Sequence, residues 1–170
     1  CCPMRIAYSE EQIKLRDELR SYFAELITPE IREKLGALEG GSLYKDVIKQ
    51  MGGDGWLGVG WPKEVGGLGR TWVEQQIWFD EARRAGAPIP FVTINTVGPA
   101  LMQLGTDAQK KRFLPGILSG DLHFAIGYTE PDAGTDLASL KTTAVRDGDQ
   151  WVINGQKIFT THAHDCDYLW

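Results

Sequence analysis

Apolar residues recur with a helical period through the first part of the chain. Between Ser9 and Ile27 they fall at i, i+4, i+7, i+8 and i+11, counted from Leu15, which predicts an amphipathic helix. Ser9 forms a capping-box signature with Gln12, and Pro29 follows the end of the pattern. The pattern therefore predicts a capped helix that ends before Pro29.

Helical patterns continue to about residue 120. The predicted segments, in chain order, are residues 43–51, 71–86, 93–104 and 106–119. Thr71 with Glu74 and Thr106 with Gln109 repeat the capping-box signature. A glycine-rich connector, residues 52–69, separates the first two of these segments. The first 120 residues are therefore predicted to be helical.

After Gly120 the period changes to the two-residue alternation of strands. Residues 123–128 alternate larger with smaller side chains, and a loop over 129–140 follows. Further strands are predicted over residues 142–146, 150–153 and 156–161. Asp147-Gly148 and Asn154-Gly155 are strong hairpin signals between them.

The pattern as a whole predicts an α+β fold. An all-α helical domain, residues 4–120, is followed by the beginning of an antiparallel β-barrel-like domain, residues 121–170. Trp170 stands where a sheet is still being built, so we expect the chain to be an incomplete portion of a longer protein. Met4 has the character of a start, and residues 1–3 are set aside from the fold reasoning.

Composition narrows the classes of protein. Hydrophobic residues make up 42% and charged residues 24% of the chain, as in ordinary globular proteins. The net charge of -5 argues against nucleic acid and anionic lipid as partners. No apolar run is long enough for a membrane span, and no signal-peptide pattern is present. Cys1, Cys2 and Cys166 show no CxxC spacing, which favours a reducing cytoplasm.

Two segments contain residue types of chemical interest but favour structural interpretations. The connector, residues 52–69, has neither a GxGxxG after a strand nor a GK[ST], so we expect tight turns around Trp56 and Trp61. The segment His162–Asp167 gathers histidine, cysteine and aspartate at short spacing, as transition-metal sites do. No second group of ligands accompanies it, so we predict a polar loop that holds no metal.

The loop Thr129–Asp136 differs because it combines hydroxyls, a proline and a glycine directly after a predicted strand. Backbone N–H groups of such a loop, aided by Thr135, suit a phosphate or a heteroaromatic edge, while a surface turn has the same composition. Glu130 and Asp136 have the chemistry of an acid and a base, but their spacing does not define a geometry. Ligand binding and a plain surface turn both stay open at this point.

The order and spacing of several motifs resemble the acyl-CoA dehydrogenase family. The matching segments are Tyr8–Gln12, Trp61–Gly67, Gly105–Pro115, Tyr128–Asp136 and Asn154–Lys157. The resemblance implies a helical N-terminal domain, a central β-domain and a C-terminal four-helix domain, of which the last is missing here. It also implies FAD as cofactor.

Two segments match the flavin site of that family. The resemblance assigns cofactor binding to Ile126, Gly127, Tyr128, Thr129, Gly134, Thr135, Phe159, Thr160 and Thr161. It implies that Thr129 holds the isoalloxazine ring, that Phe159 packs on it where the family commonly has Trp, and that Thr161 reaches its reactive edge. Tyr128 and Thr135 are also implied as substrate contacts. The catalytic base is expected beyond Trp170.

The resemblance implies α,β-dehydrogenation of an acyl-CoA thioester, with electron-transferring flavoprotein as electron acceptor and a homo- or hetero-tetramer as assembly. The segments Ile126–Tyr128 and Thr135–Leu140 are similar to actinobacterial members that act on sterol side-chain CoA thioesters as α2β2 assemblies. The chain alone is expected to be inactive. Alternatives are a non-catalytic structural subunit, a flavin monooxygenase or oxidase on the same fold, and a cofactor-free binding module.

Overall fold

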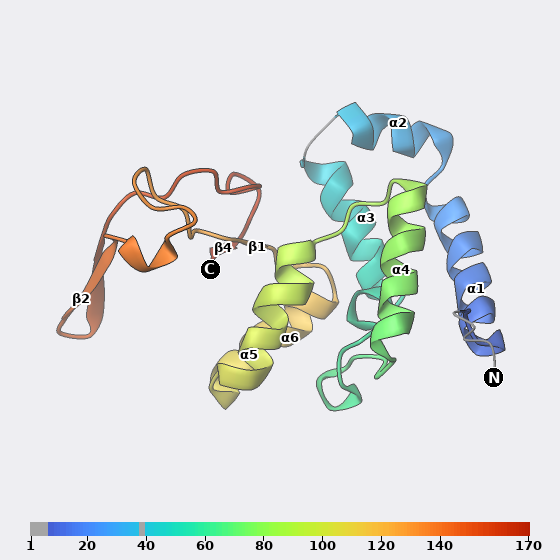
Figure 1. Cartoon of the computed structure of the whole chain (residues 1–170), viewed down its shortest axis with the longest axis horizontal. Coiled ribbons are helices and arrows are strands. Elements are labelled where there is room, and N and C mark those ends of the chain that lie inside the picture. The colour runs from blue at the N-terminus through green and yellow to red at the C-terminus, as the bar shows by residue number, and fades with distance from the viewer. Residues whose placement is uncertain (1–6, 38–39) are drawn as a thin grey trace, which may run out of the picture. The chain divides into compact units, whose positions relative to one another are not determined.

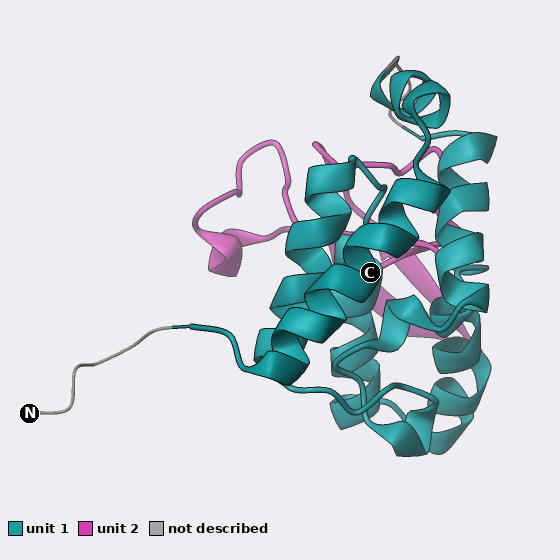
Figure 2. Ribbon diagram, turned by 90° about the vertical axis from the view of Figure 1, so that its right-hand side faces the viewer, with its two compact units in different colours: residues 1–122 teal, residues 123–170 magenta. Residues whose placement is uncertain are grey.

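The computed structural model describes residues 7–37 and 40–170, and the chain divides into two compact units, Cys1–Leu122 and His123–Trp170 (Figure 2). The sequence suggests a start at Met4, but residues 1–4 lie outside the described residues. Among the helices that the structure describes, none combines the length and the apolar character needed to cross a bilayer.

The first unit is helical, as predicted (Figure 1). Its helices are α1 (Glu10–Leu26), α2 (Pro29–Ala37), α3 (Ser42–Gly53), α4 (Trp72–Ala85), α5 (Gly98–Leu104) and α6 (Asp107–Leu118). Short 3-10 turns cover Trp56–Gly58 and Lys63–Val65, and a π-helical turn, Thr93–Val97, leads into α5. α2 was not predicted, because Pro29 begins a helix at its first position instead of following one.

The three predicted capping boxes are present. Ser9, Thr71 and Thr106 each accept from the backbone N–H three residues on, and the side chain at that position bonds back to the cap. Gly86 ends α4 with a φ of 79°, a left-handed conformation that glycine adopts without steric cost. Local signals therefore set the ends of these helices.

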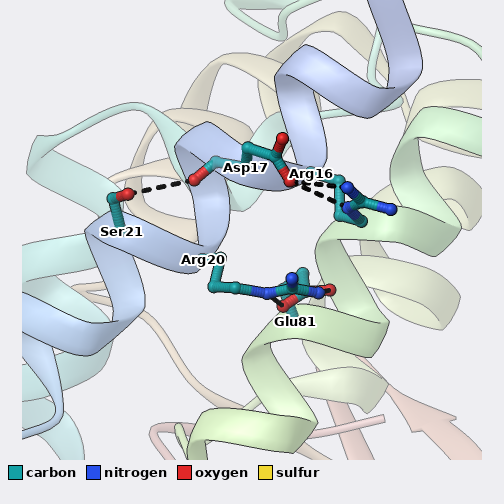
Figure 3. Close-up of polar contacts among 5 residues, drawn as sticks. All are labelled: Arg16, Asp17, Arg20, Ser21 and Glu81. Carbon is teal, nitrogen blue, oxygen red and sulfur yellow. Dashed lines mark hydrogen bonds and ion pairs between the residues drawn. The ribbon is translucent and has the colours of Figure 1, made fainter. Parts of the chain in front are cut away.

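α1 and α4 pack along each other and hold much of the core. The fully buried side chains of the unit include Leu19 and Phe23 from α1, Ile48 and Met51 from α3, Ile77 and Trp78 from α4, and Ile117 from α6. Arg20 of α1 donates two hydrogen bonds to the buried Glu81 of α4, at 2.8 and 3.0 Å (Figure 3). The nearby Arg16–Asp17 pair lies within α1 and is solvent-exposed. The Arg20 pair thus links two helices, whereas the Arg16 pair does not.

The glycine-rich connector folds into tight turns around Trp61, as predicted. The indole is 3% exposed and donates from Nε1 to the carbonyl oxygen of Ile94 at 3.0 Å. Gly98 lies against the same ring, and a side chain there would overlap it. The connector is therefore a packing element that supports the π-helical turn.

The second unit contains two pairs of strands. β1 (Phe124–Ala125) pairs in parallel with β4 (Tyr168–Leu169), and β2 (Thr143–Asp147) pairs antiparallel with β3 (Gln150–Asn154). The strand expected over 123–128 is thus only two residues long, and its partner lies more than 40 residues along the chain. The long intervening segment makes the parallel pairing geometrically accessible.

The hairpin predicted at Asp147-Gly148 is present, because β2 and β3 are joined there with Asp147 opposite Gln150. Its side chains are exposed on both faces, with Val145 opposite Val152 and with Ile153 68% exposed. The second expected hairpin, at Asn154-Gly155, is not formed. The strand expected over 156–161 is also wrong, since those residues follow an irregular path.

Candidate functional site

The loop after β1 folds back on itself in a tight turn. Glu130 and Ala133 exchange two backbone hydrogen bonds, at 2.8 and 3.1 Å, so that Pro131 and Asp132 form an exposed tip. Gly127 extends the pairing of β1 by donating to the carbonyl oxygen of Trp170 at 2.9 Å. The proline stiffens the tip, and β1 fixes the start of the loop.

The Glu130 carboxylate points inward from this loop and is 6% exposed. Oε2 accepts from the backbone N–H of Lys141 at 2.7 Å, and Oε1 accepts from the backbone N–H of Thr142 at 3.0 Å. The Thr142 hydroxyl and the Lys157 ammonium, at 2.8 Å, also donate to Oε1. The Lys157 hydrogen bond, followed by those from Thr142 and Lys141, lowers the pKa of Glu130 from its ordinary value of 4.5 to about 2.

These contacts correct one of the sequence interpretations. Glu130 was a candidate acid or base, but its carboxylate is ionised and committed to donors from three residues, which leaves it a structural anion. Asp136 accepts through its backbone carbonyl from Ser139, in a short 3-10 turn, Leu137–Ser139. Glu130 is therefore occupied by structural contacts, and Asp136 contributes its backbone to the following turn.

The structure brings together the two segments that the sequence singled out. The Lys157 ammonium donates to the carbonyl oxygen of Tyr128 at 3.1 Å as well as to Glu130. The backbone N–H of Ile158 donates to the carbonyl oxygen of Thr129 at 2.9 Å. Three consecutive loop residues are thus bonded to the two residues that precede Phe159.

Phe159 has an unusual environment. Its backbone has a φ of 55°, a left-handed conformation that is rare for residues other than glycine, and its ring is 87% exposed. The next turn closes through Ala163, which donates to the carbonyl oxygen of Thr160 at 3.2 Å. The left-handed residue and the turn explain why a strand does not form here. Backbone strain of this kind concentrates at ligand sites.

The rest of the candidate loop offers an open surface. Thr135 is exposed, Tyr128 is 38% exposed, and nothing lies within 4 Å of the position that a side chain at Gly134 would take. Ile126 and Thr129 are half-buried beside them. Open space, hydroxyl groups and an uncovered aromatic ring fit the chemistry of a flavin ring system.

The segment His162–Asp167 forms a compact turn. The carbonyl oxygen of His162 accepts from the backbone of Asp165 and of Cys166, at 3.0 and 3.1 Å, and the Cys166 thiol donates to Ala163. The Asp167 carboxylate accepts from the backbone of His123 at 2.8 Å. Over residues 7–37 and 40–170, histidine, cysteine and carboxylate side chains do not gather in threes where they could hold a metal ion.

A cleft in the first unit was not predicted from the sequence. It has a volume of about 570 Å³, within the usual range for small-molecule sites. Aromatic and other apolar side chains line it together with a few polar ones: Trp61, Trp72, Gln75, Phe79, Arg83, Phe91, Ile94, Asn95, Pro99 and Met102. Trp72 and Phe91 are exposed at this cleft, and their place in a contiguous apolar surface becomes visible only in the folded chain.

Two family models match the chain, one to each unit. Residues 9–121 match the N-terminal domain of acyl-CoA dehydrogenases, and residues 125–170 match their middle domain.

Similar proteins agree with this match. Acyl-CoA dehydrogenase FadE26 of Mycobacterium tuberculosis is 59% identical over 98% of this chain and 43% of its own length. Among solved structures, the ChsE4-ChsE5 complex from Mycobacterium tuberculosis contains a chain that is 60% identical over 98% of this chain and 42% of that one, with a TM-score of 0.92. A steroid ACAD, Tcur3481-Tcur3483, is 58% identical over 98% of this chain and 44% of its own chain, also with a TM-score of 0.92. The chain spans less than half the length of these relatives.

Proposed function

The chain belongs to the acyl-CoA dehydrogenase family, and we propose that it forms part of a longer enzyme that binds FAD and dehydrogenates an acyl-CoA thioester between its α and β carbons. One observation carries this proposal. Lys157 and Ile158 join the loop that contains Thr129 to the segment that contains Phe159, at 2.8 to 3.1 Å. The two segments that the resemblance assigns to one flavin ring are therefore adjacent.

The resemblance supplies the roles in this proposal. Backbone groups of Ile126–Thr129 and of Gly134, together with the Thr129 hydroxyl, hold the isoalloxazine ring, while Thr135 contacts the pyrophosphate or the thioester. Phe159 packs on the ring, and Thr160 and Thr161 approach its edge. The open space at Gly134 and the exposed ring of Phe159 support these roles. FAD, when bound, supplies the hydride acceptor.

Proton removal is assigned to no residue of this chain. Glu130 is the most buried carboxylate of the candidate loop, but Lys141, Thr142 and Lys157 donate to its two oxygens and hold it as a structural anion. The carboxylate that takes the α proton is proposed to lie in the C-terminal domain. This chain would contribute cofactor binding, orientation and hydrogen bonds to the thioester.

For the substrate class, we propose a bulky apolar acyl group, such as a sterol side-chain CoA thioester. The steroid ACAD at 58% identity supports this class, and the aromatic lining of the 570 Å³ cleft suits an apolar group. The ChsE4-ChsE5 complex supports an assembly with a second, different subunit. The sequence resemblance implies an α2β2 arrangement for it. Electron-transferring flavoprotein as acceptor and a cytoplasmic location complete the proposal.

The test is an anaerobic titration of the full-length protein, purified together with its partner subunit. The protein should be isolated with FAD, and a sterol side-chain CoA thioester should bleach the visible flavin absorption. A colourless protein that cannot be reconstituted with FAD would contradict the proposal and favour a cofactor-free module. Bound flavin that no acyl-CoA reduces would favour a structural subunit. Rapid reoxidation of the reduced flavin by dioxygen would favour an oxidase or monooxygenase.

A further inference from the structure

The contacts of Glu130 and Lys157 form a lock across three separate segments of the second unit. Glu130 accepts from residues 141 and 142, directly before β2, and from Lys157, shortly after β3. The side chain of Lys157 is 21% exposed and that of Glu130 is 6% exposed, so this ion pair is shielded from water on most sides. Shielded, charge-assisted hydrogen bonds are the strong ones.

The lock is distinct from the local fold of the loop. The turn at Glu130–Ala133 closes through its own backbone hydrogen bonds and does not need the carboxylate. The carboxylate instead ties the turn to the segment that enters β2, and Lys157, in the segment that leaves β3 at the same open end of the hairpin, also donates to the carbonyl oxygen of Tyr128. The side chains of Glu130 and Lys157 thus set the relation between segments, whereas the backbone sets the shape of each.

The residues on either side of the lock are less buried than Glu130: Thr129 is half-buried, and Phe159 is 87% exposed. Thr129 precedes Glu130, and Phe159 follows Lys157 by two residues. Among the hydrogen bonds of the described residues 123–170, the backbone bond from Ile158 to Thr129, at 2.9 Å, is the other direct link between the segments. Loss of the lock would leave that single bond to set the position of Thr129 relative to the Phe159 ring.

We propose that Glu130 and Lys157 are positioning residues, which hold the Thr129 and Phe159 segments at the separation that a flavin ring requires without touching the flavin themselves. This inference rests on the proposed FAD site. A ligand gains affinity when its contacts are held in place before it binds, because less ordering accompanies binding. Loosening the lock should therefore weaken FAD binding even though each contact residue is unchanged.

The experiment uses the full-length protein with its partner subunit and the variants Glu130→Gln, Lys157→Met and the double variant. Each single variant should raise the FAD dissociation constant about tenfold or more, the effect of losing a charge-assisted hydrogen bond. The double variant should lose less affinity than the sum of the two single losses, since the two side chains share one ion pair. The visible absorption spectrum of the bound flavin should shift in all three, and Lys157→Arg should recover part of the affinity.

Asp132→Asn is the matched control, because Asp132 lies on the same turn and pairs with Lys141 at 3.1 Å, but both side chains are about three-quarters exposed. It should leave FAD affinity and spectrum unchanged. Hydrogen exchange of the apo-protein should show faster exchange at Ile158 in the lock variants only. If Glu130→Gln fails to fold, Lys157→Met carries the test.

The outcomes separate the two proposals. A wild-type protein without FAD would overturn the proposed function. A wild-type protein with FAD, together with lock variants that keep its affinity and spectrum, would overturn the positioning role alone. Additive losses in the double variant would also overturn it, because they would show that the two residues act separately.

Discussion

Phe159 provides the sharpest test of the proposed flavin contacts. Its ring is 87% exposed, so it contributes little to packing within the second unit. Its φ of 55° costs free energy, of the order of 1–3 kcal/mol for a residue other than glycine. An aromatic ring held uncovered on a strained backbone has nearly all its surface available to a ligand.

We therefore expect Phe159→Ala in the full-length protein to weaken FAD binding while leaving the fold intact. A stacked ring contributes about 0.5–1.5 kcal/mol beyond its buried area. The lost apolar area adds about 1–2 kcal/mol. Together these terms raise the FAD dissociation constant from about tenfold to a few hundredfold. The melting temperature of the apo-protein should change little, because the ring makes few contacts there.

Three further variants separate the ring from the backbone. Phe159→Gly removes the ring and also relieves the left-handed backbone, so the apo-protein should become no less stable while FAD affinity falls. Phe159→Trp supplies the aromatic residue common in the family and should keep FAD. Phe124→Ala removes a ring stacked on Tyr168 at 5.3 Å, so it should lower the melting temperature without selective loss of FAD. The assays are the FAD-to-protein ratio, the quenching of flavin fluorescence on binding, and thermal melting. An unchanged FAD affinity in Phe159→Ala would refute the placement of the second segment, and the roles of Thr160 and Thr161 would fall with it.

The remaining predictions concern stability, pH, the isolated chain and metal. Arg20→Leu leaves the buried Glu81 carboxylate of α4 without its partner, so it should lower the urea midpoint of unfolding. Arg16→Leu should lower it less, because the exposed Arg16–Asp17 pair contributes about 0–1 kcal/mol. Equal midpoints in the two variants would contradict this. The lowered pKa of Glu130 means that its contribution to stability is complete above about pH 4.5 and is lost as pH falls through about 2. Circular dichroism should therefore show that Glu130→Gln flattens acid unfolding in that window, and superimposable profiles would refute it. The 170-residue chain alone should lack dehydrogenase activity and should associate through the exposed faces of its hairpin; turnover of an acyl-CoA, or a monodisperse species by light scattering, would show otherwise. Metal analysis of protein purified without added metal should find no stoichiometric zinc, whereas zinc lost in a His162→Ala and His164→Ala double variant would overturn that prediction.

Helix ends could be predicted wherever the residues that cap them lie within a few positions of the end. The boxes at Ser9, Thr71 and Thr106 set three N-termini, and each forms as the spacing indicates. The π-helical turn at Thr93–Val97 could not be predicted, because it depends on Trp61, whose indole bonds the Ile94 carbonyl from a distant part of the chain. Sequence periodicity contains no record of such a contact.

The second unit was harder for the same reason. The β2–β3 hairpin is local and was predicted, but the pairing of Phe124 with Tyr168 joins residues far apart in sequence. The segment 156–161 has the composition of a strand, yet its hydrogen bonds go to the Thr129 loop and to a following turn. Contacts with residues far along the chain therefore explain why β1 is shorter than predicted and why residues 156–161 do not form a strand.

In the candidate site, too, some residues could be identified from the sequence and others only from their contacts in the structure. Loop composition pointed to Thr129 and Gly134, and the family resemblance pointed to Phe159. Gly134 borders open space and the Phe159 ring is exposed. Sequence reasoning did not identify the buried ion pair between Glu130 and Lys157, because an acid and a base 27 positions apart give no periodic or motif signal. In our proposal, that ion pair sets the positions of Thr129 and Phe159 relative to each other. Strained and uncovered residues persist only where the surrounding structure holds them, so a rigid, shielded lock beside a strained aromatic ring is what a preorganised binding site requires. The residues that recognise a ligand can therefore be proposed from composition and family resemblance, whereas the residues that hold them in place are found only from the contacts of the folded chain.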